Sequence, residues 1–297
     1  MAFVLFAGLK RARARPVWKA TSFFSTAKST VDEEEVHKFS EAAGDWWGNG
    51  DAKNTNAVGP LHLMNPVRVN YIRRRTSEHF GLGSDLGLSA RPLEGLKILD
   101  IGCGGGILSE SLARLGGQVT GIDASLPSVE AAQRHSSLNQ GTSGIQYLHT
   151  TVEDFVAQQG AGSKDDGLFD IVCALEIIEH VAEPQHFLHE CSKLIRPEGC
   201  MFVSTLNRTS RSYFLAILMA EQVLKMVPPR THDWAKFVKP EELEHCMEAI
   251  NGLRGDGQKD LALRDITGMQ FNPMTKKWYE NKDDVEVNYI AQCAFLK

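Results

Sequence analysis

Two acids flank a glycine-rich segment whose spacing suits the binding of a nucleoside. Asp100 lies near the end of an apolar run over residues 96–101, and Asp123 directly follows a second such run over 118–122. Three alternating glycines lie between the acids: Gly102, Gly104 and Gly106. A glycine turn between a strand and a helix brings backbone N–H groups close to a ligand without an intervening side chain. Asp123 comes 21 residues after the first glycine, about the spacing at which a carboxylate holds a ribose diol.

The order of the glycines separates two classes of ligand. Dinucleotide sites use the pattern G-x-G-x-x-G, whereas this chain has G-x-G-x-G, with Asp100 two residues before the first glycine. That variant resembles the first motif of class I S-adenosylmethionine (SAM) methyltransferases. SAM has no pyrophosphate but carries an ammonium group, which the Asp100 carboxylate would suit directly or through water. We therefore expect SAM at Asp100, Gly102, Gly104 and Asp123, with a dinucleotide or a ligand-free glycine turn as the alternatives.

A second group of polar side chains follows the fourth predicted strand. Glu176, Glu179 and His180 are spaced i, i+3 and i+4, so a helical turn would point all three to one side. Two carboxylates and an imidazole could bind a divalent metal, with water completing its shell. They could equally supply a general base, or form a polar helix start with structural hydrogen bonds. After the third predicted strand, Glu153 could accept a hydrogen bond from an adenine amino group, or favour a helix dipole in its first turn.

These groups need a framework that brings strand ends together. Apolar runs alternate with helical patterns, which is typical of a parallel sheet with helices on both faces. The expected strands cover 96–101, 118–122, 145–149, 169–174 and 200–205. A helix is predicted over 184–194, and the Pro/Gly segment 195–199 predicts a turn before the fifth strand. The expected fold class is α/β, a Rossmann-like doubly wound sheet of the class I SAM-methyltransferase type.

The C-terminal part has a different pattern. Proline followed by acids predicts a helix from Pro240. Two β-like runs follow, 265–271 and 287–295, and the polar stretch 272–286 between them indicates a loop. Because the runs are close in sequence, they favour an antiparallel pair at one edge of the sheet. The sheet is therefore expected to be mostly parallel with one antiparallel edge strand.

The basic residues are unevenly distributed. The formal net charge is −5, yet residues 1–30 contain six Lys and Arg and no acid, which leaves 26 basic against 37 acidic residues in the rest. An acidic body argues against nucleic acid as a partner. The basic, Ser/Thr-rich start predicts an organelle transit peptide, with a mitochondrial address favoured by its arginines and a basic tail as the alternative. The six cysteines form no C-x-x-C pair, so we expect small core residues in a reducing compartment.

Several segments together carry a more specific resemblance. In their order and approximate spacing they are similar to the ubiquinone-biosynthesis O-methyltransferases, and the similarity extends from about residue 35 to the end of the chain. Those segments are Lys38-Phe39, Asp45-Trp46-Trp47, Asn65-Pro66-Val67-Arg68-Val69-Asn70-Tyr71-Ile72, the glycine motif, Glu176-Ile177-Ile178-Glu179-His180 and Thr231-His232-Asp233-Trp234. The glycine motif is generic to methyltransferases, whereas the combination is specific.

The resemblance implies roles for individual positions. In that family the residues that match Arg68, Gly102 and Asp123 bind SAM, and so does the position of Leu175, where leucine would offer backbone and van der Waals contacts. A guanidinium at Arg68 would suit the carboxylate of the ligand. The family residues that match the Glu176, Glu179 and His180 cluster are divalent-metal ligands, usually described as binding magnesium.

The resemblance also implies a reaction. It is the O-methylation of catechol hydroxyls on polyprenylated ubiquinone precursors, a 3,4-dihydroxy-5-polyprenylbenzoate and a demethylubiquinol. A metal chelated by both catechol oxygens would favour the phenolate and orient it. Two alternatives stay open. One is a metal-free small-molecule methyltransferase with Glu176 or His180 as the base, and the other is a degenerate, non-catalytic assembly subunit.

An apolar insertion is expected at about 207–238. Its core, 213–220, is too short to span a membrane, and basic residues flank it: Arg208, Arg211, Lys225 and Arg230. Such a segment could lie on an anionic membrane, act as a lid, or pack as an ordinary helix. We expect a transit peptide over 1–30, a helical segment over 31–90 and a methyltransferase domain over 91–297. The expected location is peripheral, on the matrix side of the mitochondrial inner membrane, in a complex with other ubiquinone-biosynthesis proteins.

Overall fold

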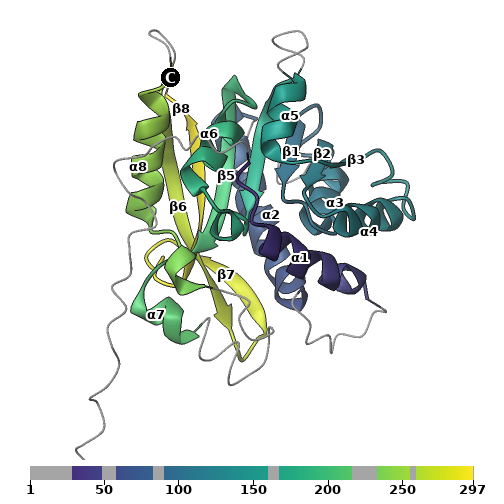
Figure 1. Ribbon diagram of the computed structural model, residues 1–297, viewed down its shortest axis with the longest axis horizontal. Helices are drawn as coiled ribbons and strands as arrows, with labels where there is room; N and C mark the ends of the chain where they lie inside the picture. The colour runs from purple at the N-terminus through teal and green to yellow at the C-terminus, as the bar shows by residue number, and fades with distance from the viewer. Residues whose placement is uncertain are drawn as a thin grey trace, which may run out of the picture.

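One sheet organises the part of the chain that the computed structural model describes, residues 29–48, 58–82, 90–159, 167–215, 233–254 and 259–296 (Figure 1). Within these residues it has eight strands in the spatial order β3-β2-β1-β4-β5-β8-β6-β7. Their bounds are β1 Lys97–Ile101, β2 Gln118–Asp123, β3 Gln146–His149, β4 Phe169–Leu175, β5 Ile195–Leu206, β6 Leu261–Asn272, β7 Lys277–Asn281 and β8 Asn288–Phe295. The first five strands are parallel, and the expected α/β fold class is confirmed.

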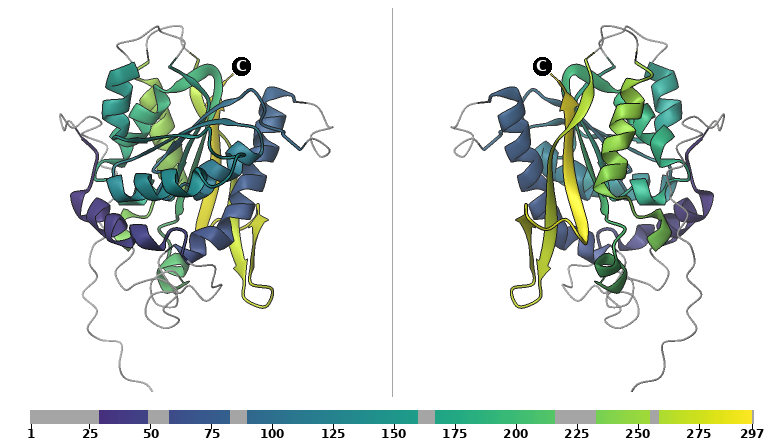
Figure 2. Two further views of the ribbon diagram at one scale, coloured as in Figure 1. Left: turned by 90° about the vertical axis from the view of Figure 1, so that its right-hand side faces the viewer. Right: turned by 90° about the vertical axis from the view of Figure 1, so that its left-hand side faces the viewer.

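Helices cover both faces of the sheet. Their bounds are α1 Glu33–Glu41, α2 Gly59–Phe80, α3 Ile107–Arg114, α4 Leu126–Ser136, α5 Val152–Gln159, α6 Pro184–Ser192, α7 Ser210–Ser212 and α8 Pro240–Asn251, with short 3-10 turns η1 Ala42–Asp45, η3 Ile178–His180 and η5 Trp234–Lys236. Successive strand residues point to opposite faces, so Ile98 packs with α2 and α3, and Leu99 with α5, α6 and α8. Figure 2 shows α2 and α8 on opposite sides of the C-terminal strands.

The C-terminal strands depart from the parallel pattern in an order that the sequence did not predict. β8 is antiparallel to both β5 and β6 and lies between them, while β7 is the antiparallel strand at the edge. The loop predicted over 272–286 is therefore wrong in part, because β7 lies inside it and pairs with β6. The segment was misread because Trp278 and Tyr279 stand among charged residues on an edge strand with little burial.

The turn predicted over 195–199 is also wrong. β5 already begins at Ile195, which pairs with Phe169, and the next pair joins Cys200 to Ile171. The residues between them form a bulge in the strand, so the Pro and Gly that indicated a turn mark an irregularity of the ladder. The predicted helix over 184–194 ends at Ser192.

The strand order reverses at β1, since β2 and β4 lie on opposite sides of it. In open α/β sheets the crevice at such a point, outside the carboxyl ends of the strands, receives the ligand. All six cysteines are buried, as expected of core residues. None of the described helices is long and apolar enough to cross a membrane. Residues 1–28 of the predicted transit peptide and 216–232 of the predicted insertion lie outside the described part of the chain.

Candidate active site

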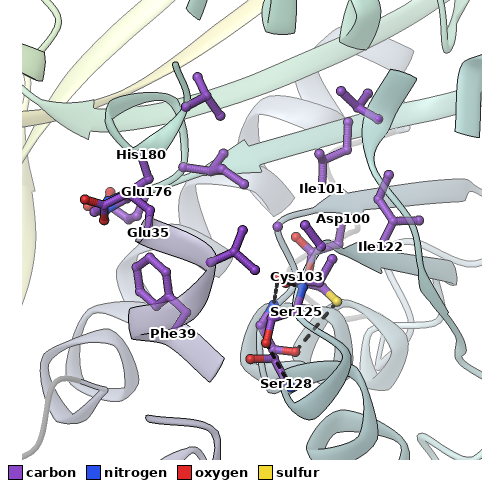
Figure 3. Close-up of a pocket in the computed structure, with 18 of the residues that line it drawn as sticks. Glu35, Phe39, Asp100, Ile101, Cys103, Ile122, Ser125, Ser128, Glu176 and His180 are labelled. Atoms are coloured by element: carbon purple, nitrogen blue, oxygen red, sulfur yellow. Dashed lines mark hydrogen bonds and ion pairs between the residues drawn. The ribbon is translucent and has the colours of Figure 1, made fainter. Parts of the chain in front are cut away.

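A pocket lies at the carboxyl ends of β1, β2 and β4, and α1 forms one of its walls (Figure 3). It contains about 1120 Å³ of space between atoms, part of it open to solvent. Nine of the ten predicted site residues line it: Arg68, Asp100, Gly102, Gly104, Asp123, Glu153, Leu175, Glu176 and His180. The tenth, Glu179, lies behind the pocket wall and is 3% exposed.

The glycine turn after β1 has a backbone that other residues would strain. Gly102 has φ 71° and Gly104 has φ 51°. A Cβ at Gly102 would lie 2.1 Å from a carbon of Ile177, and one at Gly104 would lie 2.6 Å from the ring of Trp46. Only glycine satisfies both the left-handed backbone and the close approach. Because no side chain intervenes at these positions, the backbone of the glycine turn lies directly against the pocket.

Asp123 binds this turn with one carboxylate oxygen and the start of α4 with the other. Gly104 donates its backbone N–H to Oδ2 at 2.8 Å, and Ser125 donates its backbone N–H to Oδ1 at 2.7 Å. Burial raises the pKa of Asp123, and these two bonds oppose the rise. Each carboxylate oxygen has a second lone pair, so a ribose diol can still donate to Asp123.

Two buried, oppositely charged side chains lie deeper in the pocket. Asp100 is 3% exposed, accepts from the Ser109 hydroxyl at 2.6 Å, and has its pKa raised to about 6 by burial. Arg68 is also buried, donates to Asn65 at 3.3 Å, and leaves its Nε buried without a hydrogen-bond partner within the described structure. A ligand with both an ammonium and a carboxylate would match this pair, as the amino-acid end of SAM does.

The position of Glu153 is compatible with both roles that the sequence left open, and it decides neither. It is an acid in the first turn of α5, and it lines the pocket. Its Oε1 accepts the backbone N–H of Thr30 at 2.9 Å, whereas its Oε2 is buried with no hydrogen-bond partner in the described part of the chain. A buried carboxylate oxygen without a donor is costly, and an adenine amino group would supply one.

The polar cluster after β4 is arranged differently from the predicted helical turn. Only residues 178–180 form a turn, of the 3-10 type, and Glu176 precedes it with φ 53°, a left-handed conformation rare for glutamate. Glu176 accepts from the Ser204 hydroxyl at 2.5 Å. Glu179 accepts from Thr205 at 2.9 Å, and its pKa is raised to about 8 by burial and by the nearby charge of Glu176.

His180 pairs with a residue that the sequence did not single out. Its Nδ1 lies 2.9 Å from Oε2 of Glu35 on α1, and this contact lowers the pKa of Glu35 to about 2. The three members of the predicted cluster thus have three separate protein partners. No three His, Cys, Asp or Glu side chains within the described ranges come together as a group that could hold a metal ion.

Sequence reasoning also gave no chemical role to the N-terminal segment that covers the pocket. Glu35 is one of three consecutive acids at the start of α1, a pattern that indicates only a helix N-terminus. Trp46 was singled out by resemblance alone, and in the structure it lies on the glycine turn and donates to Ser128 at 3.2 Å. Neither contact has a signal in local spacing, because the partners are 145 and 82 residues away.

The chain is similar to known proteins over most of its length. A family profile described as "Methyltransferase domain" matches residues 72–252. A protein of Parvibaculum lavamentivorans named "Ubiquinone biosynthesis O-methyltransferase" is 43% identical over 265 residues, 89% of this chain and 94% of that protein. Proteins of the same name from Rhizobium leguminosarum and Glaesserella parasuis are 42% and 41% identical, again over 89% of this chain and over 94% and 98% of their own lengths.

Solved structures share the fold at much lower identity. The magnesium protoporphyrin IX methyltransferase of Synechocystis, solved with bound SAH, has a TM-score of 0.57 and 19% identity, over 89% of this chain and 100% of its own. The plantazolicin methyltransferase BpumL with a substrate analogue and SAH has a TM-score of 0.55 and 15% identity, over 90% of this chain and 100% of its own. Both are methyltransferases with the same sheet architecture.

Proposed function

The chain belongs to the ubiquinone biosynthesis O-methyltransferase family, and we propose that it methylates catechol hydroxyls on polyprenylated ubiquinone precursors, a 3,4-dihydroxy-5-polyprenylbenzoate and a demethylubiquinol. Its methyl donor is S-adenosylmethionine. The observation that carries the proposal is the single pocket in which a nucleoside half, built on Asp123 and the glycine turn, adjoins an acid–histidine half. Val36, Phe39 and Val181 line the second half and offer an apolar wall to an aromatic ring.

The cofactor half positions the methyl donor. Asp123 accepts from the ribose hydroxyls, Glu153 accepts from the adenine amino group, and Asp100 and Arg68 hold the ammonium and the carboxylate. Leu175 contributes backbone and van der Waals contacts at the end of β4. Because Asp100 and Arg68 are buried, their charges act in a poorly solvated site and constrain the ligand strongly.

The reaction is an in-line displacement. The catechol oxygen attacks the methyl carbon, a C–O bond forms, the C–S bond breaks, and the sulfur keeps the electron pair as S-adenosylhomocysteine leaves. The phenolic proton passes to Glu176 or His180, which both line the pocket. Orientation of the two reactants by the pocket supplies much of the rate enhancement.

A divalent cation, magnesium, is part of the same proposal. Glu176, Glu179 and His180 offer two carboxylates, which suit magnesium, and one imidazole within five residues, but the described structure does not bring them together as a metal-binding group. To bind a cation, the two carboxylates would have to turn from Ser204 and Thr205, whereas His180 would keep Glu35 at Nδ1 and use Nε2. When bound, the cation would favour the ionised form of a chelating catechol.

One assay tests substrate and cation together. Purified protein is given labelled SAM and a short-tailed 3,4-dihydroxybenzoate, with and without EDTA and with magnesium added back. We expect methyl transfer that EDTA abolishes and magnesium restores. Full activity in EDTA would discard the cation and leave Glu176 or His180 as the base. SAM binding without transfer to any catechol would leave the non-catalytic assembly subunit as the remaining alternative.

The proposed location is the matrix side of the mitochondrial inner membrane, peripherally bound and in a complex with other ubiquinone-biosynthesis proteins. The basic, acid-free composition of residues 1–30 supports a transit peptide. The relatives named above are bacterial, so they lend the address no support. A fusion of residues 1–30 to a reporter should enter mitochondria, and a reporter that stays in the cytosol would refute the address.

A further inference from the structure

Helix α1 contacts His180 through two side chains that are one helical turn apart. Glu35 Oε2 lies 2.9 Å from His180 Nδ1, with the two side chains only 12% and 13% exposed. The ring of Phe39 meets the imidazole edge-on, with 5.0 Å between centroids and an interplanar angle of 90°. Figure 3 shows Glu35, Glu176 and His180 gathered at one end of the pocket, away from Asp100. A carboxylate and an aromatic ring from one helix thus restrict the imidazole from two directions.

Glu35 is itself held in place. Its other oxygen, Oε1, accepts from Lys38 Nζ at 2.7 Å, one turn along α1. Because Lys38 holds the other oxygen, the Glu35 carboxylate keeps one orientation toward the imidazole. An exposed acid, in contrast, would sample several rotamers. Glu33 and Glu34, the neighbouring acids of the first turn, are exposed.

We propose that Glu35 is a positioning residue for His180, fixing the orientation of its ring and the nitrogen that carries its proton. A carboxylate at Nδ1 favours the tautomer with the proton on that nitrogen, which leaves the lone pair on Nε2. Acceptance of the phenolic proton and ligation of a cation both need that lone pair. The proposal rests on the catechol O-methyltransferase function proposed above, and it adds to that reaction a residue from outside the methyltransferase motifs.

A merely structural role for Glu35 would have other consequences. Residues 29–48 also attach to the domain at Thr30, whose N–H bonds Glu153, at Ser40, whose hydroxyl lies 2.8 Å from that of Ser125, and at Trp46. If Glu35 only fastened this segment, its loss would lower SAM affinity and thermal stability together. A positioning role predicts a loss of kcat with SAM affinity preserved.

The test compares Glu35→Ala and Glu35→Gln with Glu34→Gln in the full chain, using the dihydroxybenzoate assay and calorimetry for SAM. Glu34 is the matched control, an exposed acid on the same turn. We expect kcat to fall about 10- to 100-fold in Glu35→Ala, and less in Glu35→Gln, whose amide oxygen still accepts from Nδ1. The Kd for SAM should stay within about twofold, and Glu34→Gln should match the wild type. In a His180→Ala background Glu35→Ala should cause no further loss, because one residue acts through the other.

A second readout needs no activity. The side-chain nitrogen NMR signals of His180, identified by their loss in His180→Gln, should show the Nδ1–H tautomer in the wild type and a mixture of tautomers in Glu35→Ala. Wild-type kcat in Glu35→Ala, losses that add to those of His180→Ala, or an unchanged tautomer would each overturn the positioning role. If Glu35→Ala does not fold, Glu35→Met, which fills the space of the glutamate without an acceptor for Nδ1, carries the same comparisons. A wild type that transfers no methyl group to a catechol would instead overturn the proposed function, with the NMR result still deciding the fate of Glu35.

Discussion

In the proposed site, Asp123 would serve the protein and the ligand with the same two oxygens. Because Gly104 and Ser125 already donate to it, Asp123→Asn places an amide N–H against a backbone N–H as well as removing a charge. We expect SAM binding to weaken by about 2–3 kcal/mol, roughly 30- to 150-fold. Calorimetry measures this, with Asp283→Asn, an exposed acid in the turn between β7 and β8, as the control. Unchanged affinity in Asp123→Asn would remove this residue from the cofactor site.

We expect Asp100 to make SAM binding depend on pH. Burial raises its pKa to about 6, so in the free protein it loses its charge as the pH falls through 6 rather than through 4. The ammonium group of SAM prefers the ionised form, and each pH unit below the pKa therefore weakens binding by up to about tenfold. Affinity measured from pH 8 to pH 5 should fall below pH 6 in the wild type. Asp100→Asn should bind weakly and lose this dependence, and a flat wild-type profile would contradict the prediction.

The sequence could predict the positions of the site residues that belong to one continuous strand–turn–strand motif. Gly102, Gly104 and Asp123 were predictable because a strand, a turn and a second strand fix their geometry over 22 residues. The arrangement of Glu176, Glu179 and His180 was not, because a positive φ at Glu176 turns the first of them out of the helical spacing. Glu35 was not predictable either, since only the fold brings α1 to His180.

At the scale of elements, the segment from α1 to η1 covers the part of the pocket where we propose that SAM binds. Trp46 is 5% exposed and lies on the turn that contains Gly104. We expect Trp46→Ala to raise the dissociation rate of SAM about tenfold or more, because it opens a buried cover, and Trp46→Phe to retain most of that cover. Stopped-flow displacement measures the rate. Trp278→Ala, in β7 and away from the pocket, should cost stability without changing that rate, and equal effects at both tryptophans would refute the cover.

The strands were predictable where a run of apolar residues coincides with a stretch that the fold buries. β1, β2 and β4 are apolar runs between turns, and each begins or ends within one or two residues of its expected bounds. β7 and the bulge in β5 were missed because edge pairing and ladder irregularities depend on the neighbouring strand. The insertion of β8 between β5 and β6 likewise depends on tertiary packing, since two antiparallel runs alone indicate a pair but not its neighbours.

At the scale of the whole molecule, the proposed membrane contact has less basic charge behind it than the sequence indicated. Tyr213, Phe214 and Leu215 are 44%, 52% and 39% exposed after α7, an apolar surface beside the active-site domain. Two of the four flanking basic residues are paired with acids, however. Arg208 is buried and bonded to Glu242, and Arg211 is paired with Asp284 at 2.7 Å. The attraction to anionic lipid therefore falls to Lys225 and Arg230, which lie outside the described residues.

The difference between the paired residues, Arg208 and Arg211, and the other two, Lys225 and Arg230, predicts the outcome of a liposome experiment. At about 1 kcal/mol for each basic residue near an anionic surface, Lys225 and Arg230 would give a modest preference for anionic vesicles that salt removes. Replacing Lys225 and Arg230 by Gln should abolish that preference and leave weak binding to neutral vesicles. Phe214→Ser with Leu215→Ser should weaken binding to both kinds of vesicle, whereas Leu138→Ser, at a site 82% exposed after α4, should change neither.

The Phe214 and Leu215 changes should also slow methylation of long-tailed substrates more than that of short-tailed analogues. Equal slowing of both would show that these side chains serve as a lid or as packing, because a membrane entrance matters only to the tail.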